Sequence, residues 1–188
     1  MLGLDTATGE IALVFFTTLA PSGILAFMIM AAALLRGIED DVRTAIMKML
    51  CIPLIVAMVG LVASATHLGN PSNALYVLMG VGRSPLSNEV FAAVVFFALA
   101  GSFWLYSFTL KRRRVFETVW LVLIIVAGAA AITGIALAYS VDTIVTWDST
   151  FVPVMLWLNA LVGGPVLALL SLSVADGACV TRGGLRAL

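Results

Sequence analysis

Charged residues are scarce in this chain, and histidine is scarcer still. Only 11% of the 188 residues are Asp, Glu, Lys or Arg, whereas soluble domains carry about 25%. Hydrophobic residues make up 62% of the chain, and its mean hydropathy is +1.15. This balance excludes an ordinary soluble globular domain and indicates an integral membrane protein.

Five long stretches contain no charged residue. A helix needs roughly 20 apolar residues to cross a bilayer, and lipid cannot satisfy exposed backbone groups, so spans are helices or closed barrels. Barrel strands would alternate apolar and polar residues, and these stretches do not. We therefore predict an all-α polytopic transmembrane helix bundle that forms a single domain, 1–188, with spans at about 11–35, 49–66, 90–110, 118–141 and 151–175.

The lack of metal-binding side chains limits the chemistry of this protein. His67 is the only histidine, and Cys51 and Cys179 are the only cysteines. Bis-histidine haem, zinc and di-iron sites need more such ligands, and the distant cysteines are expected to be ordinary free thiols. We predict no haem and no metal site here, so electron transfer would need cofactors on another subunit.

Lysine and arginine fall on alternate loops. Nine of the ten would lie on one side of the membrane, and Arg83 alone on the other. Because basic loops stay in the cytoplasm, the N-terminus is predicted outside and the C-terminus inside. The nine residues are Arg36, Arg43, Lys48, Lys111, Arg112, Arg113, Arg114, Arg182 and Arg186.

An acid and a base border the longest polar loop. His67 ends the second apolar run, and Glu89 opens the third. The apolar stretch 74–79 between them predicts a short interfacial helix or a re-entrant segment. Ser84 and Pro85 predict an N-cap followed by proline at the first position of the next helix.

The two ionisable residues have a functional and a structural interpretation. Ionisable groups at the rim of a span are costly and are candidates for function. A histidine and a carboxylate at one aqueous boundary suit proton transfer to or from a small substrate. Alternatively, His67 is an interfacial side chain bonded to a backbone carbonyl, and Glu89 is stabilised by the positive end of its helix.

Polar and small residues elsewhere predict helix packing. Asn159 is expected to donate a hydrogen bond between helices, and Ala130 with Gly134 forms a small-residue packing face. Gly163-Gly164-Pro165 predicts a kink and a close helix approach. The loop 139–153 predicts a capped turn with an interfacial tryptophan, or else a docking surface or one wall of the site near Glu89.

The motifs together closely resemble the membrane anchor subunit of dimethyl sulfoxide reductase. The resemblance runs over nearly the whole chain and rests on the combination of motifs rather than on any one of them. They are His67-Leu-Gly-Asn-Pro, Ser87-Asn-Glu89, Asp142-Thr, Thr146-Trp147 and Gly163-Gly-Pro165. The family forms an eight-helix bundle, whereas this sequence shows five spans, as a shortened member or a partial chain would.

The resemblance implies a role in anaerobic respiration. It implies an anchor in the bacterial inner membrane that binds and oxidises menaquinol at the periplasmic face. Its implied partners are an iron–sulfur electron-transfer subunit and a molybdopterin catalytic subunit, which carry the other cofactors. The functional histidine and glutamate of the family fall on His67 and Glu89, and the same site would include Arg83, Ser87 and Asn88.

Two other functions remain open from the residues alone. A purely structural anchor would assemble the complex without binding quinol. A small-solute or proton-coupled transporter would need a charged pathway inside the membrane, and the five predicted spans contain no Asp, Glu, Lys or Arg. In the quinol hypothesis, Arg83 would hold either the Glu89 carboxylate or the partner subunit.

Overall fold

The protein is all-helical throughout the part that the computed structural model describes, which is residues 2–66, 71–109, 113–140 and 151–186. Five of its helical stretches are long and apolar enough to cross a membrane, as the sequence predicted. The elements are α1 (Leu2–Leu34), α2 (Asp40–Met49), α3 (Cys51–Thr66), the 3-10 helix η1 (Pro71–Gly80), α4 (Pro85–Tyr106), α5 (Arg114–Ala138) and α6 (Phe151–Arg186).

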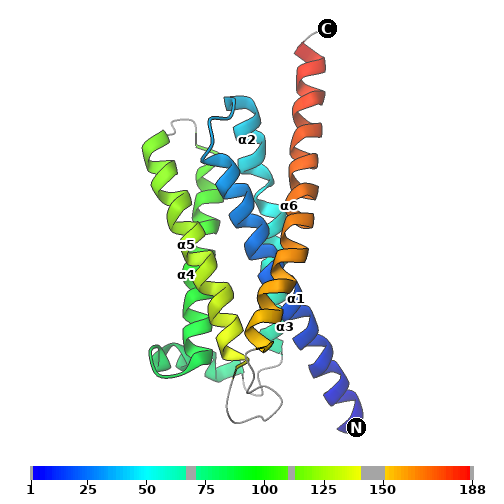
Figure 1. Ribbon diagram of the computed structural model, residues 1–188, viewed down its shortest axis with the longest axis vertical. Helices are drawn as coiled ribbons and strands as arrows, with labels where there is room; N and C mark the ends of the chain where they lie inside the picture. The colour runs from blue at the N-terminus through cyan, green and yellow to red at the C-terminus, as the bar shows by residue number, and fades with distance from the viewer. Residues whose placement is uncertain (1, 67–70, 110–112, 141–150, 187–188) are drawn as a thin grey trace.

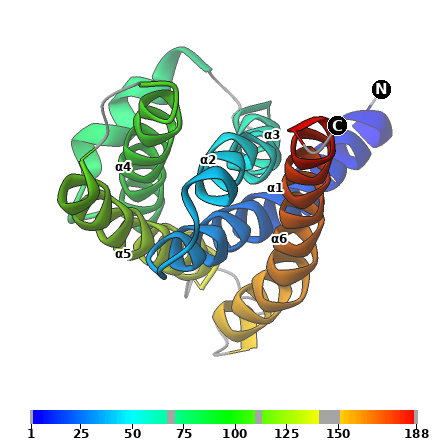
Figure 2. The ribbon, with the colours of Figure 1, turned by 90° about the horizontal axis from the view of Figure 1, so that it is seen from above.

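Helix α1 lies at the centre of the bundle and packs against α3, α5 and α6, while α4 packs on the outer side of α5 (Figure 2). The turn after α1 and the C-terminal ends of α4 and α6 lie at one end of the bundle (Figure 1). We call this the basic end, since Arg36, Lys48 and Arg113 are there. The opposite end carries η1 and the start of α4, and we call it the Glu89 end.

The second span is longer than predicted, because α2 extends it at its N-terminal side. The prediction began at residue 49, but helical structure begins at Asp40. Pro53 has no amide hydrogen to donate to the carbonyl of Met49, and α2 ends at Met49 with a turn at Leu50 before α3 begins. The indole of Trp104 donates to the Lys48 carbonyl at 3.0 Å, so this break is supported by α4.

Glycine allows α1 and α3 to cross in close contact. A Cβ at Gly23 would lie 2.5 Å from the Ala57 nitrogen, and one at Gly60 would lie 2.5 Å from the Ala20 nitrogen. Both distances are far below van der Waals contact, so any larger residue would push the helices apart. Such small-residue contacts are the usual way to pack helices where lipid removes the hydrophobic driving force.

A proline in α1 creates the polar contact that holds α6. Pro21 cannot donate to the carbonyl of Thr17 one turn earlier, so that oxygen loses its helical partner. The Asn159 side chain of α6 donates to it at 2.9 Å. This contact confirms the interhelical hydrogen bond predicted for Asn159. Close approach is possible because Gly163 faces α1, where its Cβ would lie 2.3 Å from the Ser22 hydroxyl.

The small-residue face predicted for α5 is only half correct. Gly134 packs against α4, where an added Cβ would lie 3.1 Å from the Glu89 Cα. Ala130 is exposed, so it takes no part in that contact. The second close approach of α5 is made by Gly128, whose Cβ would lie 2.7 Å from the Met28 sulfur in α1.

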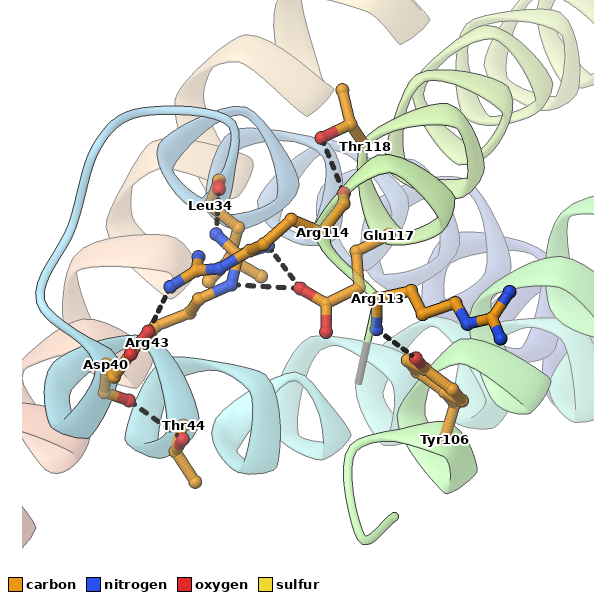
Figure 3. A network of polar contacts seen from close by, with 9 residues as sticks. All are labelled: Leu34, Asp40, Arg43, Thr44, Tyr106, Arg113, Arg114, Glu117 and Thr118. Atoms are coloured by element: carbon orange, nitrogen blue, oxygen red, sulfur yellow. Dashed lines mark hydrogen bonds and ion pairs between the residues drawn. The ribbon is translucent and has the colours of Figure 1, made fainter. Parts of the chain in front are cut away.

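Charged residues are buried within the spanning helices, which corrects the prediction that the spans contain none. Arg43 and Glu117 are 4% and 1% exposed. The Arg43 guanidinium donates to Glu117 Oε2 from Nε at 3.0 Å and from Nη2 at 2.6 Å, and also to the Leu34 carbonyl (Figure 3). The prediction failed because α2 and α5 begin before the charge-free runs. Arg114 and Asp40 form a second, exposed ion pair nearby.

Removing Asn159 should destabilise the bundle by about 1 kcal/mol, the usual size of such bonds within membranes. Asn159→Leu leaves the Thr17 carbonyl unpaired, and denaturation in mixed detergent micelles measures the cost. Pro21→Ala restores a backbone donor to that carbonyl. The cost of Asn159→Leu should therefore fall to near zero in the Pro21→Ala background, and an undiminished cost would contradict this assignment.

Breaking the Arg43–Glu117 ion pair should cost about 3–5 kcal/mol, since one buried charge is then left without its counter-charge. We expect this for Arg43→Met and for Glu117→Leu, measured by the same unfolding assay. The double variant should be more stable than either single one. Arg114→Gln serves as the control, because its exposed pair contributes less than about 1 kcal/mol. Additive costs in the double variant would refute the pairing.

Candidate functional site

The predicted site residues differ in their exposure at the Glu89 end. Glu89 and Ser87 are each 4% exposed, whereas Arg83 and Asn88 are exposed. His67 lies outside the described residues, as do Asp142 and Trp147 of the second polar loop. The structure therefore brings Ser87 and Glu89 into the interior of the bundle and leaves Arg83 and Asn88 at its surface.

The start of α4 is fixed by local sequence chemistry. Ser84 is the N-cap residue with an extended backbone, and Pro85 occupies the first turn, as predicted, although the Ser84 side chain makes no capping hydrogen bond. Gly82 has a φ of +83°, a conformation that favours glycine. Its amide donates to Asn88 Oδ1 at 2.7 Å. Asn88 thus ties the preceding turn to the helix that carries Glu89.

The segment before α4, predicted as a short interfacial helix or a re-entrant segment, forms the 3-10 helix η1. At its end, a Cβ on Gly80 would lie 2.5 Å from the Ser87 hydroxyl, so the turn packs closely over the first turn of α4. Ser87 is buried by this contact. These residues shape the loop that leads to Glu89.

Glu89 continues the core-facing side of α4. The buried residues that follow it are spaced by four and three positions, which places them on one helix face with Glu89 at its start. They are Ala93, Phe96, Ala100 and Phe103. Gly134 of α5 packs against the backbone of Glu89. A carboxylate is thus placed on the inner face of a spanning helix, where burial is costly.

Tyr139 lies near Glu89 at the C-terminal end of α5. Its ring is half-buried and faces Phe16 of α1, with ring centroids 6.2 Å apart. Burial raises the pKa of the Tyr139 phenol, and the Glu89 carboxylate raises it further. The phenol therefore stays protonated and can donate a hydrogen bond. Its loop was predicted as one possible wall of the site, but Tyr139 itself was not predicted as a site residue.

An open cavity of about 280 Å³ lies beside Tyr139, between α1, α5 and α6. Its lining is almost entirely apolar. Its volume is close to the lower size limit of small-molecule pockets. The described lining residues are Thr17, Tyr139, Phe151, Val152, Met155 and Leu156. Phe151 and Val152 belong to the loop 139–153 that was predicted as one possible wall of the site, whereas Met155 and Leu156 carry no sequence signal for this role, because apolar side chains are equally expected to face lipid.

Arg83 does not hold Glu89 among the described side chains. Arg83 is exposed, Glu89 is buried, and no ion pair joins these two described residues. A contact with a partner is the predicted alternative that remains for Arg83. The ion pairs Arg43–Glu117 and Arg114–Asp40 join the first turns of α2 and α5 (Figure 3), and both helices begin at the basic end (Figure 1).

Comparison with known proteins gives one consistent family. The C subunit of anaerobic dimethyl sulfoxide reductase from Escherichia coli K12 is 33% identical over 165 residues, which is 87% of the present protein and 58% of the relative. Its counterpart from Haemophilus influenzae is 32% identical over 165 residues, with 88% and 59% covered. The YnfH subunit of anaerobic dimethyl sulfoxide reductase from Escherichia coli K12 is 30% identical over 156 residues, with 83% and 55% covered.

The present protein spans less than two thirds of the length of these relatives. No solved structure matches it. The model of the family described as DMSO reductase anchor subunit (DmsC) matches residues 4–182, which is nearly the whole sequence. The protein therefore belongs to the DMSO reductase anchor subunit family.

Proposed function

We propose that this protein anchors a molybdopterin oxidoreductase complex in the bacterial inner membrane and oxidises menaquinol. The observation that carries the proposal is the buried Glu89 carboxylate on a spanning helix, close to Tyr139 and its apolar cavity. A quinol is an apolar ring with two hydroxyl groups, and it needs this combination of apolar walls and few polar groups. Family membership supports the same function.

The chemistry of the step is the removal of two electrons and two protons from one quinol molecule. Glu89 accepts one proton from a quinol hydroxyl as a general base. His67 hydrogen-bonds the quinol and accepts the other proton, since imidazole titrates near neutral pH. The electrons pass to an iron–sulfur subunit, which delivers them to a molybdopterin catalytic subunit. The product in the membrane is menaquinone.

The remaining predicted site residues have supporting roles in this proposal. Asn88 and Ser87 hold the turn before α4 in place, as their contacts with Gly82 and Gly80 suggest. Arg83 is exposed at the same end and offers a cation to the partner subunit. Glu89 and His67 are the two proton acceptors in this proposal.

The distribution of charge supports a periplasmic position for the quinol site. Apart from Arg83, the described basic residues of the loops lie at the end opposite Glu89, and basic loops stay in the cytoplasm. Protons from the quinol would then be released to the periplasm. No proton would cross the membrane, so the step would be electroneutral.

Replacing Glu89 should lower the rate of quinol oxidation without preventing assembly of the complex. We expect Glu89→Gln to reduce kcat/KM by at least about 100-fold, the contribution of a general base. His67→Gln should cause a comparable loss. The assay is oxidation of a soluble naphthoquinol by membranes that contain the assembled complex, with the terminal acceptor supplied.

The matched control is Glu39→Gln, since Glu39 is an exposed carboxylate at the basic end and should leave turnover unchanged. Normal assembly with unchanged quinol oxidation in Glu89→Gln and His67→Gln would reject the proposal. A purely structural anchor would instead be indicated if the wild-type complex assembled normally but bound no quinol.

The sidedness can be tested with single cysteines in a Cys51→Ser, Cys179→Ser background. When the protein is expressed without its partner subunits, Arg83→Cys should react with a membrane-impermeant maleimide added to the periplasmic side of intact cells. Glu39→Cys should react only after lysis. Both positions are exposed and lie at opposite ends of the bundle. The reverse pattern would place the Glu89 end in the cytoplasm.

A further inference from the structure

We propose that the cavity between α1, α5 and α6 holds the fused aromatic ring of the quinol, and that Tyr139 is a quinol-contacting residue. In this arrangement the Tyr139 hydroxyl donates a hydrogen bond to the quinol oxygen that gives its proton to Glu89. The inference rests on the proposed function and extends it, because it adds Tyr139 and the first turns of α6 to a site that the sequence motifs locate at His67 and Glu89, with the loop 139–153 as a possible wall.

The cavity has a defined construction. Thr17 contributes the α1 wall, and the first turns of α6 contribute another wall. The bond from Asn159 to the Thr17 carbonyl joins these two walls one turn after the cavity-lining residues of α6. The breadth of the cavity is therefore set by a specific contact rather than by loose packing.

The lining matches a fused ring in both polarity and size. Val152, Met155 and Leu156 contribute branched or flexible apolar side chains from α6, and Phe151 adds an aromatic ring. Such a lining binds flat apolar rings without requiring polar partners. A cavity of about 280 Å³ holds the ring system of a quinol, but not its long isoprenoid tail. The tail would leave through the open side toward lipid.

Tyr139 connects the cavity with the carboxylate. It lines the cavity, and it is close enough to Glu89 for the two groups to interact electrostatically. As the quinol oxygen loses its proton to Glu89, negative charge develops on that oxygen. A phenol that keeps its own proton stabilises this charge by donating a hydrogen bond. The proton balance is unchanged, because the Tyr139 proton stays on Tyr139.

The test uses the assembled complex in membranes, with a soluble naphthoquinol as donor and a short-tail naphthoquinone as binding probe. Val152→Phe fills the cavity and should raise the KM for the naphthoquinol and the Kd for the naphthoquinone by about tenfold, with kcat nearly unchanged. Tyr139→Phe keeps the ring and removes one hydrogen bond. It should lower kcat/KM by about three- to tenfold.

Two matched variants control for indirect effects. Val154→Phe adds the same bulk to an exposed position of α6, and Tyr106→Phe removes a phenol at the basic end that accepts a bond from the Arg113 amide. Both should leave naphthoquinone affinity unchanged. If they weaken it as much as Val152→Phe and Tyr139→Phe do, the effects are structural and the inference is overturned.

Failure of this inference can be separated from failure of the proposed function. If Glu89→Gln abolishes quinol oxidation while Val152→Phe and Tyr139→Phe leave KM, kcat and Kd unchanged, the quinol site exists but lies elsewhere. If none of these variants changes quinol oxidation or naphthoquinone binding, both proposals fail. Selective losses in Val152→Phe and Tyr139→Phe support the inference.

Discussion

Every polar group that enters the hydrocarbon region must find its partner within the protein. The carbonyl of Thr17 shows how far this constraint shapes the bundle. Pro21 removes its helical partner, and Asn159 of α6 replaces that partner. The bond fixes α6 beside the central helix, and Gly163 allows the approach. Because the same two helices line the cavity, a backbone requirement in α1 determines the shape of the candidate site.

Two buried carboxylates meet this constraint in different ways. Glu117 is paired with Arg43, which also donates to the end of α1, and this arrangement joins three helices (Figure 3). Glu89 has no ion pair with any described cation. It lies instead beside a phenol and near an apolar cavity. A buried charge that is paired with an opposite charge stabilises the fold. An ionisable group at the rim of a span is instead suited to proton transfer.

The sequence was sufficient for the architecture, because charge-free runs and proline positions act locally. The presence of five apolar helices, the start of α4 at Pro85 and the role of Asn159 were predicted correctly, whereas the second span begins at Asp40 and not at residue 49. The inward direction of Arg43 and Glu117 was missed, since span limits set by charge stop before the first turns of α2 and α5. The part of the cavity wall formed by Met155 and Leu156 was also missed, because the same apolar residues can face lipid or a ligand.

The most direct measurement of the central claim is the rate at which quinol reduces the iron–sulfur clusters of the proposed complex. Rapid mixing with a naphthoquinol, followed by freeze-quench electron paramagnetic resonance, reports this electron transfer before turnover at the terminal substrate. Our account predicts fast reduction in the wild-type complex and at least about 100-fold slower reduction in Glu89→Gln. Equal rates of cluster reduction in the two complexes would contradict it.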